Sequence, residues 1–191
     1  MKYFSELARK SIHFSSLAIP VGMFLLPLRI SQPLLLGLAL FTLSLDVIRL
    51  HVKQARQVFY FVFGRILREH ERFNLLGGTY LFLSALISIF AFQRTVAAVS
   101  VAYLVVGDTM AALIGRRWGR VRILDKSLEG SLACLASCLL LGWLVPGHEL
   151  GAARIIVGSV VATLFELLPI PLDDNMRIPL AAGFAMTLLR S

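Results

Sequence analysis

Residues Gly107–Ser131 read GDTMAALIGRRWGRVRILDKSLEGS and join two apolar segments through a strongly basic connection. Asp108 lies near the end of the first segment. An acid inside a membrane segment usually marks a functional site, because its burial is costly. Small residues follow at helical spacing (Ala112, Gly115 and Gly119), and they let a second backbone or a ligand come close. The stretch therefore predicts that a second backbone or a ligand lies close to this acid.

The connection carries a cluster of five basic residues, namely Arg116, Arg117, Arg120, Arg122 and Lys126. Such a cluster suits the binding of several phosphates, and taken alone it would equally suit a loop that only sets membrane orientation. Ser127 can cap the helix that follows, whose amino end offers unpaired backbone N–H groups to an anion. Together with Asp108, these residues predict a site for a metal–nucleotide complex at a membrane surface.

Composition places the chain in a membrane. Of its 191 residues 58% are hydrophobic and 16% are charged, and the mean hydropathy is +0.80. A soluble domain averages about 45–50% apolar and roughly 25% charged residues. Because helices satisfy their own backbone hydrogen bonds in lipid, we expect an all-α, polytopic membrane bundle. The net charge of +8 is explained by cytoplasmic loops, so no nucleic-acid partner is expected.

Apolar segments of spanning length recur along the chain and predict about seven transmembrane helices. They cover residues 12–28, 33–50, 75–92, 95–114, 129–146, 151–169 and 176–190. Residues 56–67 are too short and too charged to span, and we expect them to lie along the membrane interface. No repeat or soluble domain is visible, so residues 1–191 are expected to form a single membrane domain.

The distribution of basic residues predicts the orientation. With seven spans, fifteen of the 19 Lys and Arg residues fall on the side of the amino terminus, and only Arg29, Arg94, Arg154 and Arg190 fall on the other. The positive-inside rule then places the amino terminus in the cytoplasm. Most acidic residues fall on the same side, which favours an enzyme with a cytoplasmic active site over a transporter with polar groups near the midplane.

Other polar residues carry weaker signals. Asp173, Asp174 and Asn175 stand between proline-bounded runs, where they are either a surface turn or oxygen ligands for Mg²⁺. Glu166 could face the same place. Asp46 and Arg49 are spaced to pair within one helix. The sequence leaves open whether His13 has a role or is only an interfacial residue. The pair Cys134 and Cys138, one helical turn apart, is read as packing residues.

Some catalytic patterns are absent. The sequence contains no G-x-x-x-x-G-K-[ST], because Asp125 precedes Lys126, so a P-loop is excluded. It also contains no G-x-S-x-G and no H-E-x-x-H, which leaves acyl-hydrolase and zinc-protease functions without support.

Four motifs resemble those of one family. GDTMAALIGRRWGR followed by LDKSLEGS is similar to the pattern G-D-x-x-A-x-x-x-G-x-x-x-G and K-S-x-E-G of the polyprenol kinase family, which includes dolichol kinases, phytol kinases and CTP-dependent diacylglycerol kinases. The amino-terminal ELARKSIH resembles the family's E-x-x-R-K-x-x-H, and LGGTYLFLSAL its G-x-T-Y stretch. The closing ATLFELLPIPLDDNMRIPLAAG resembles its E and D-D-N-x-x-x-P motif. The likeness covers nearly the whole chain.

The resemblance implies transfer of a phosphoryl group from CTP to the hydroxyl of a membrane lipid such as a polyprenol, dolichol, phytol or diacylglycerol. By position in the motifs, the nucleotide site would include Gly107, Asp108, Gly115, Gly119, Lys126, Ser127, Glu129 and Gly130. The metal or catalytic site would include Asp173, Asp174 and Asn175. We add Arg116, Arg117 and Arg120 as ligands of the triphosphate, with Asp108 and either Asp173 or Asp174 holding Mg²⁺.

The expected catalytic set is therefore Asp108, Lys126, Glu129, Asp173 and Asp174. Either Asp174 or Asp46 could orient the lipid hydroxyl or accept its proton. Cytidylyl transfer, as in the CDP-diacylglycerol synthases, is the nearest alternative, although those enzymes usually show K-T-x-E-G and a closing G-H-G-G-x-x-D-R. A transporter of lipids or anions is a further alternative, and the sequence leaves homo-oligomer formation open.

Overall fold

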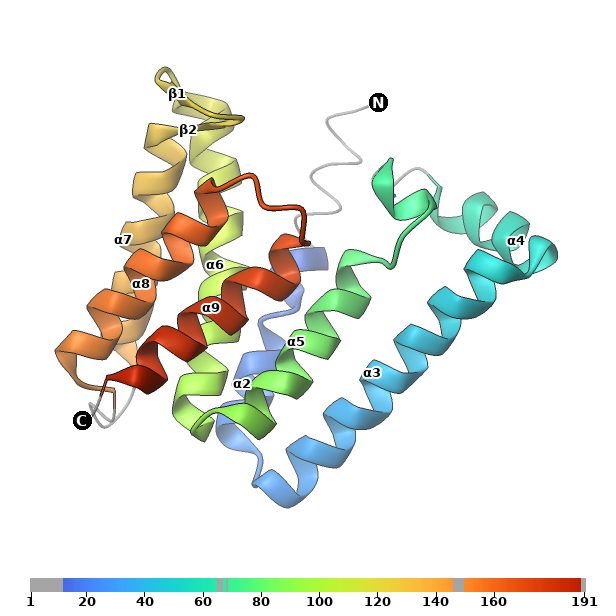
Figure 1. Cartoon of the computed structure of the whole chain (residues 1–191), viewed down its shortest axis with the longest axis horizontal. Helices are drawn as coiled ribbons and strands as arrows, with labels where there is room; N and C mark the ends of the chain where they lie inside the picture. The colour runs from blue at the N-terminus through green and yellow to red at the C-terminus, as the bar shows by residue number, and fades with distance from the viewer. Residues whose placement is uncertain (1–11, 65–66, 68, 146–149, 190–191) are drawn as a thin grey trace.

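The computed structural model describes residues 12–64, 67, 69–145 and 150–189. It is all-helical, as predicted, apart from one small hairpin (Figure 1). The elements in chain order are α2 (Ala18–Leu25), α3 (Leu28–His51), α4 (Lys53–Phe63), the 3₁₀ helix η1 (His70–Arg72), α5 (Gly77–Ala91), α6 (Arg94–Trp118), β1 (Arg122–Ile123), β2 (Lys126–Ser127), α7 (Leu128–Leu144), α8 (Gly151–Leu167) and α9 (Asp174–Leu188).

Helix α6 forms the centre of the bundle. It packs against α2, α5, α7, α8 and α9, and every residue from Val96 to Val105 is buried. A helix that is apolar on all sides is expected to be buried on all sides. Its small side chains allow the neighbours to come close, and α7 and α9 lie along it over much of its length (Figure 1).

The first apolar segment does not form one regular helix. Residues Ser16 and Leu17 form a turn before α2 begins. The hydroxyls of Ser15 and Ser16 donate to the carbonyl oxygen of Ile12, and such local bonds compete with the helical ladder. Pro20 adds a second cause, because it has no N–H to donate to the carbonyl of Ser16.

The helices α3 and α6 are the two in the described residues that are long and apolar enough to cross a membrane. The apolar window of α3 is only 22% buried inside the protein, so most of its surface must meet an apolar environment. Several other helices are shorter, among them α5 and α7. These helices indicate a membrane protein, whereas the seven-span topology and the cytoplasmic amino terminus stay predictions.

Helix α4 is a separate short helix outside the bundle, joined to the end of α3 (Figure 1). Its sequence KQARQVFYFVF places apolar and polar residues on opposite faces, and Phe61 and Val62 are exposed. This arrangement agrees with the expected interfacial segment, and its contact with lipid stays a prediction.

Three connections, the longest of which contains α4 and η1, bring six helix termini to one end of the bundle. The carboxyl ends of α3, α6 and α8 lie there with the amino ends of α5, α7 and α9 (Figure 1). The opposite end is fastened by two arginines. Arg94 donates to the carbonyl oxygens of Met23 and Phe24 in the last turn of α2 and of Leu26 just after it. Arg154 donates to Leu189 O at 2.9 Å and to Gln93 Oε1 at 3.4 Å.

Candidate active site

A cleft of about 580 Å³ opens at the end of the bundle where the six termini meet. Its walls come from the last turns of α6, the hairpin, the start of α7, the end of α8 and the start of α9. The lining residues are Asp108, Ala111, Ala112, Gly115, Arg116, Gly119, Arg122, Asp125, Lys126, Ser127, Gly130, Ser131, Glu166 and Asp174.

The hairpin turns the basic connection into an ordered wall of this cleft. Arg122 pairs with Ser127 and Ile123 with Lys126 in an antiparallel ladder. The turn between the strands places Leu124 at φ 55°, a left-handed conformation that costs energy for a residue with a branched side chain. The hairpin thereby fixes the backbone from which Lys126 extends.

The start of α7 is capped as the sequence predicts. The Ser127 side chain accepts a hydrogen bond from Gly130 N at 3.2 Å, and the Leu128 N–H donates to Val121 O at 2.9 Å. Glu129 Oε1 accepts from the backbone N–H groups of Arg120 at 3.0 Å and Val121 at 3.2 Å. Glu129 therefore holds the connection between α6 and α7 against the first turn of α7, and it does not line the cleft.

Three glycines let α6 and α7 approach closely behind the cleft. A Cβ at Gly115 would lie 2.7 Å from Ser127 Oγ, and one at Gly119 would lie 2.8 Å from the same atom. A Cβ at Gly130 would lie 2.7 Å from the backbone oxygen of Ala111. Since any side chain would separate the two helices, the glycine pattern of the sequence reflects this close approach.

Opposite charges meet on the wall formed by α8 and α9. Lys126 Nζ lies 2.7 Å from Glu166 Oε1 and 3.6 Å from Asp174 Oδ2, and it also donates to the carbonyl oxygen of Glu166. That carbonyl belongs to the last turn of α8, where helical partners run out. Arg177, one turn into α9, is paired with Asp174. Glu166 thus faces the cleft, as the sequence suggested.

Asp108 has a partner that the sequence did not reveal. His13 Nε2 lies 3.4 Å from Asp108 Oδ2, and both side chains are largely buried. His13 therefore belongs to the site and is not a residue of the interface without contacts. The preceding residues of the amino-terminal motif, 6–11, lie outside the described residues.

The acidic start of α9 rests on the start of α5. Asp173 caps α9, and its Oδ1 accepts from the backbone N–H of Asn175 at 2.9 Å and from the Asn175 side chain at 2.7 Å. A Cβ at Gly77 would lie 2.8 Å from Asn175 Nδ2 and 3.3 Å from Glu71 Oε1. The first turn of α5 and the Glu71 carboxylate therefore support the turn that presents Asp174.

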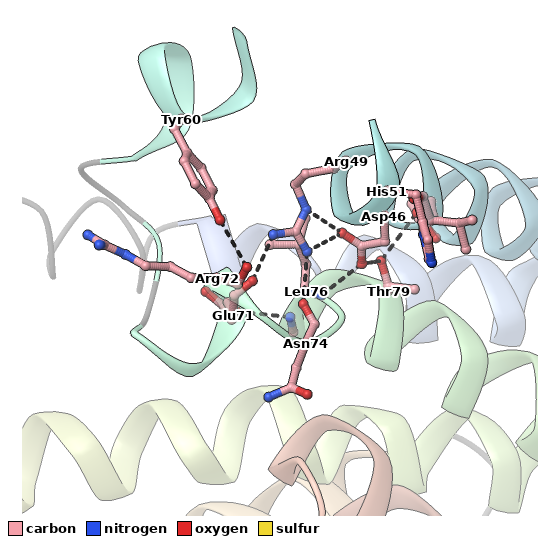
Figure 2. Close-up of polar contacts among 12 residues, drawn as sticks. Asp46, Arg49, His51, Tyr60, Glu71, Arg72, Asn74, Leu76 and Thr79 are labelled. Atoms are coloured by element: carbon pink, nitrogen blue, oxygen red, sulfur yellow. Dashed lines mark hydrogen bonds and ion pairs between the residues drawn. The ribbon is translucent and has the colours of Figure 1, made fainter. Parts of the chain in front are cut away.

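A buried ion pair between Asp46 and Arg49 holds the segment before α5 in place (Figure 2). Arg49 donates to Asp46 Oδ1 through Nε at 3.0 Å and Nη2 at 2.7 Å. It also donates to the carbonyl oxygens of Glu71 at 2.7 Å and Asn74 at 2.8 Å. Asp46 Oδ2 accepts from Leu76 N and from the Thr79 hydroxyl, both at 2.7 Å (Figure 2).

The local Asp46–Arg49 pair predicted from the sequence is confirmed, but it reaches further than one helix. Asp46 is 0% exposed and Arg49 is 2% exposed. Because both oxygens of Asp46 are occupied and sealed from solvent, this carboxylate has no access to a lipid hydroxyl. The pair instead joins α3 to the segment that leads into α5.

Several predicted site residues lie outside the cleft lining. Gly107 is packed under α7, where a Cβ would lie 2.8 Å from Cys134 Sγ and 3.0 Å from Cys138 Sγ. Both cysteines are free, buried packing residues, as predicted. Arg117 is exposed and lies over the Trp118 ring. Arg120, Glu129, Asp173 and Asn175 contribute backbone or capping contacts instead.

The cleft also includes residues outside the expected catalytic and nucleotide-binding set, namely Arg122, Asp125, Ser131 and Glu166. The first three lie inside the quoted stretch, so proximity in sequence could have found them. Glu166 is the glutamate of the closing motif, and its burial inside an apolar segment is a second signal of a role.

The cleft offers oxygen donors of the kind that Mg²⁺ takes. Asp108, Glu166 and Asp174 line it from three helices, and carboxylate oxygens are the preferred ligands of this hard cation. Among the described residues, no group of three His, Cys, Asp or Glu side chains is already arranged around a metal position. The donor chemistry therefore fits Mg²⁺ that arrives with a phosphate ligand.

No protein-family model and no solved structure matches the chain. An uncharacterised protein of Rickettsia prowazekii is 30% identical over 96% of this chain and 94% of its own length. The CTP-dependent diacylglycerol kinase 1 of Eremothecium gossypii is 31% identical over 95% of this chain, and the probable chloroplastic phytol kinase 1 of Glycine max is 36% identical over 61%.

The chain spans 66% of the Eremothecium protein and 45% of the Glycine protein. Kinases of both names also match from Schizosaccharomyces pombe and Arabidopsis thaliana. The matches to the Rickettsia and Eremothecium proteins cover at least 95% of this chain and therefore include the stretch that builds the cleft. The chain belongs to the polyprenol kinase family, with phytol kinases and CTP-dependent diacylglycerol kinases among its relatives.

Proposed function

We propose that this protein is a CTP-dependent lipid kinase that transfers the γ-phosphoryl group to the hydroxyl of a membrane isoprenoid alcohol or of diacylglycerol. The observation that carries the proposal is the cleft itself. Lys126, Arg116 and Arg122 share it with the capped start of α7 and with three carboxylates. Cations suit a triphosphate, and the names of the relatives supply CTP and the lipid class.

In this proposal the protein mainly positions the two substrates and neutralises the negative charge of the phosphates, which is what phosphoryl transfer requires. Arg116, Arg122 and Lys126 bind the triphosphate. Mg²⁺, held by Asp108 and Asp174, supplies further charge neutralisation when the nucleotide is bound.

The transfer breaks the bond between the γ-phosphorus and its bridging oxygen and forms one from the lipid oxygen. CDP leaves with the bridging oxygen, and the hydroxyl proton passes to a carboxylate of the cleft. Of the two candidates that the sequence left open, Asp46 is 0% exposed and lies outside the cleft, whereas Asp174 lines the cleft. We therefore assign the orienting role to Asp174.

An apolar groove supports a lipid acceptor. It has a volume of about 330 Å³ and lies between α2, α6 and α7, where Leu17, Val21 and Ala102 contribute to its walls. Leu17 stands one helical turn from His13, which contacts Asp108. A hydrocarbon chain in this groove would bring its alcohol end toward the cleft from the side, along the bilayer.

Transfer of γ-³²P from CTP to a panel of lipid alcohols tests the proposal. The purified protein in detergent, with Mg²⁺, would be given short and long polyprenols, geranylgeraniol, phytol and diacylglycerol. Label in the organic phase is expected for one lipid class and names the acceptor. Pyrophosphate released only when phosphatidic acid is added would instead assign cytidylyl transfer. Binding or flux of lipid or nucleotide without turnover would assign transport.

A further inference from the structure

Lys126 occupies a position that is built for a cation. Three oxygens surround its ammonium group: Glu166 Oε1 at 2.7 Å, the main-chain oxygen of Glu166, and Asp174 Oδ2 at 3.6 Å. Carboxylate and main-chain oxygens around a cation are the donor set that hard divalent ions take in proteins. An ammonium group that hydrogen-bonds here therefore stands where such an ion could also bind.

One carboxylate oxygen of Glu166 has no hydrogen-bond donor among the described residues. Its side chain is 4% exposed and lines the cleft. Its second oxygen, Oε2, is buried and accepts no hydrogen bond from any residue that the structure describes. A buried carboxylate oxygen without a donor is costly, and a bound divalent ion would satisfy it together with Oε1.

We propose that Glu166 anchors the divalent cation of the nucleotide complex, and that Lys126 holds this position only while the nucleotide is absent. When the triphosphate enters, the Lys126 ammonium turns to the phosphates and the cation takes its place on Glu166, opposite Asp108. This inference rests on the proposed function, and it leaves Asp173, one of the ligands expected from the sequence, out of the cation site. Asp173 is already committed to Asn175 as the cap of α9.

Removal of the ammonium provides the sharpest test, because it separates cation binding from catalysis. Free Mn²⁺, followed by its electron paramagnetic resonance signal, is titrated with nucleotide-free protein and without lipid. Lys126→Met is expected to bind Mn²⁺ about tenfold or more tightly than the wild type, since a repelling charge within a few ångströms has gone. Lys126→Arg, which keeps the charge, is expected to bind as weakly as the wild type.

Two further variants test whether the tighter Mn²⁺ binding of Lys126→Met depends on Glu166. The double variant Lys126→Met/Glu166→Gln is expected to lose the gain, whereas Lys53→Met, which removes an exposed charge on α4, leaves Mn²⁺ binding unchanged. Equal affinities for Lys126→Met and wild type would overturn the proposal. So would a gain that survives in the double variant.

If Lys126→Met does not fold, the single variant Glu166→Gln still tests whether Glu166 binds the cation. With a CTP analogue that cannot transfer its phosphate, this variant is expected to bind Mn²⁺ about tenfold more weakly than the wild type, while Asp173→Asn is not. If Asp173→Asn weakens Mn²⁺ binding and Glu166→Gln does not, Asp173 and not Glu166 is the ligand of the cation. Because no lipid or turnover is involved, a kinase assay that fails would not affect these outcomes, and a failed Mn²⁺ result would leave the kinase proposal standing.

Discussion

Asp108 is the single acid that α6 contributes to the cleft, and His13 lies against it. Asp108→Asn keeps the size of the side chain and removes its charge. We expect turnover to fall by about 10² or more, the typical loss when one charge-stabilising group is removed from an active site. Phosphoryl transfer from CTP measures it, with expression level and detergent extraction as controls for folding. A variant that keeps its activity would remove Asp108 from the cation site.

Gly130 is the residue that the closest helix contact depends on. A methyl group there would meet the backbone oxygen of Ala111, which no rotamer change can move away. We expect Gly130→Ala to lower the free energy of unfolding by about 1–3 kcal/mol. Thermal unfolding in detergent measures this.

The matched control is Gly37→Ala within α3, where a Cβ would meet nothing within 4 Å. Here the loss of backbone freedom in the unfolded chain should stabilise the protein by about 0.5–1 kcal/mol. Equal effects of the two changes would mean that α6 and α7 do not approach as described.

At the scale of elements, the Asp46–Arg49 pair joins α3 to the start of α5. Arg49→Met would leave the Asp46 carboxylate buried and uncompensated, so we expect a loss of about 3–5 kcal/mol in unfolding free energy. Arg56→Met on the exposed face of α4 should change it by less than about 0.5 kcal/mol. Unfolding by denaturant, followed by the circular dichroism of the helices, compares the two. A small effect of Arg49→Met would contradict the network of Figure 2.

The groove between α2, α6 and α7 gives a second prediction at this scale. Val21 lies on its wall, and Val21→Trp should fill part of the space. We expect the KM for the lipid acceptor to rise about tenfold, equal to about 1.4 kcal/mol, while the KM for CTP is unchanged. Val160→Trp on the exposed side of α8 serves as control. A parallel rise of both KM values would mean that the hydrocarbon chain of the lipid does not bind in this groove.

The elements were predictable because their causes are local. Apolar runs of helical length foretold the helices, and Ser127 before Leu128 foretold the cap of α7. The contact of His13 with Asp108 and that of Lys126 with Glu166 were not predictable. Each joins residues far apart in the chain, and which side chains meet depends on how the helices pack. Pairing of Asp46 with Arg49 was visible, but its bonds to Leu76 and Thr79 were not, for the same reason.

For the whole molecule, the orientation predicted from charge can be tested by labelling. Val121→Cys marks the hairpin end and Ala152→Cys the opposite end, both at exposed positions. We expect a membrane-impermeant thiol reagent to label Val121→Cys only from the cytoplasmic side and Ala152→Cys only from the other. The native Cys134 and Cys138 are buried and should stay unlabelled. The reverse pattern would invert the protein in the bilayer.

The apolar surface of α3 also bears on assembly. Leu40, Phe41 and Leu45 are exposed along it, so the helix must face either lipid or another chain. Formation of a homo-oligomer therefore stays a prediction, and molar mass in detergent would measure it.

The arginines at the far end of the bundle have a consequence for where the product accumulates. Arg94 ties the turn between α2 and α3 to the start of α6, and Arg154 ties the end of α9 to the start of α8. In the proposed orientation and function, the cleft lies at the other, cytoplasmic end, so the phosphate of the product is formed in the leaflet on that side. A phosphate group does not cross the hydrocarbon core unaided. A cell with this enzyme would therefore build a one-sided pool of phospholipid product, available to cytoplasmic consumers and hidden from exterior ones until a flippase moves it.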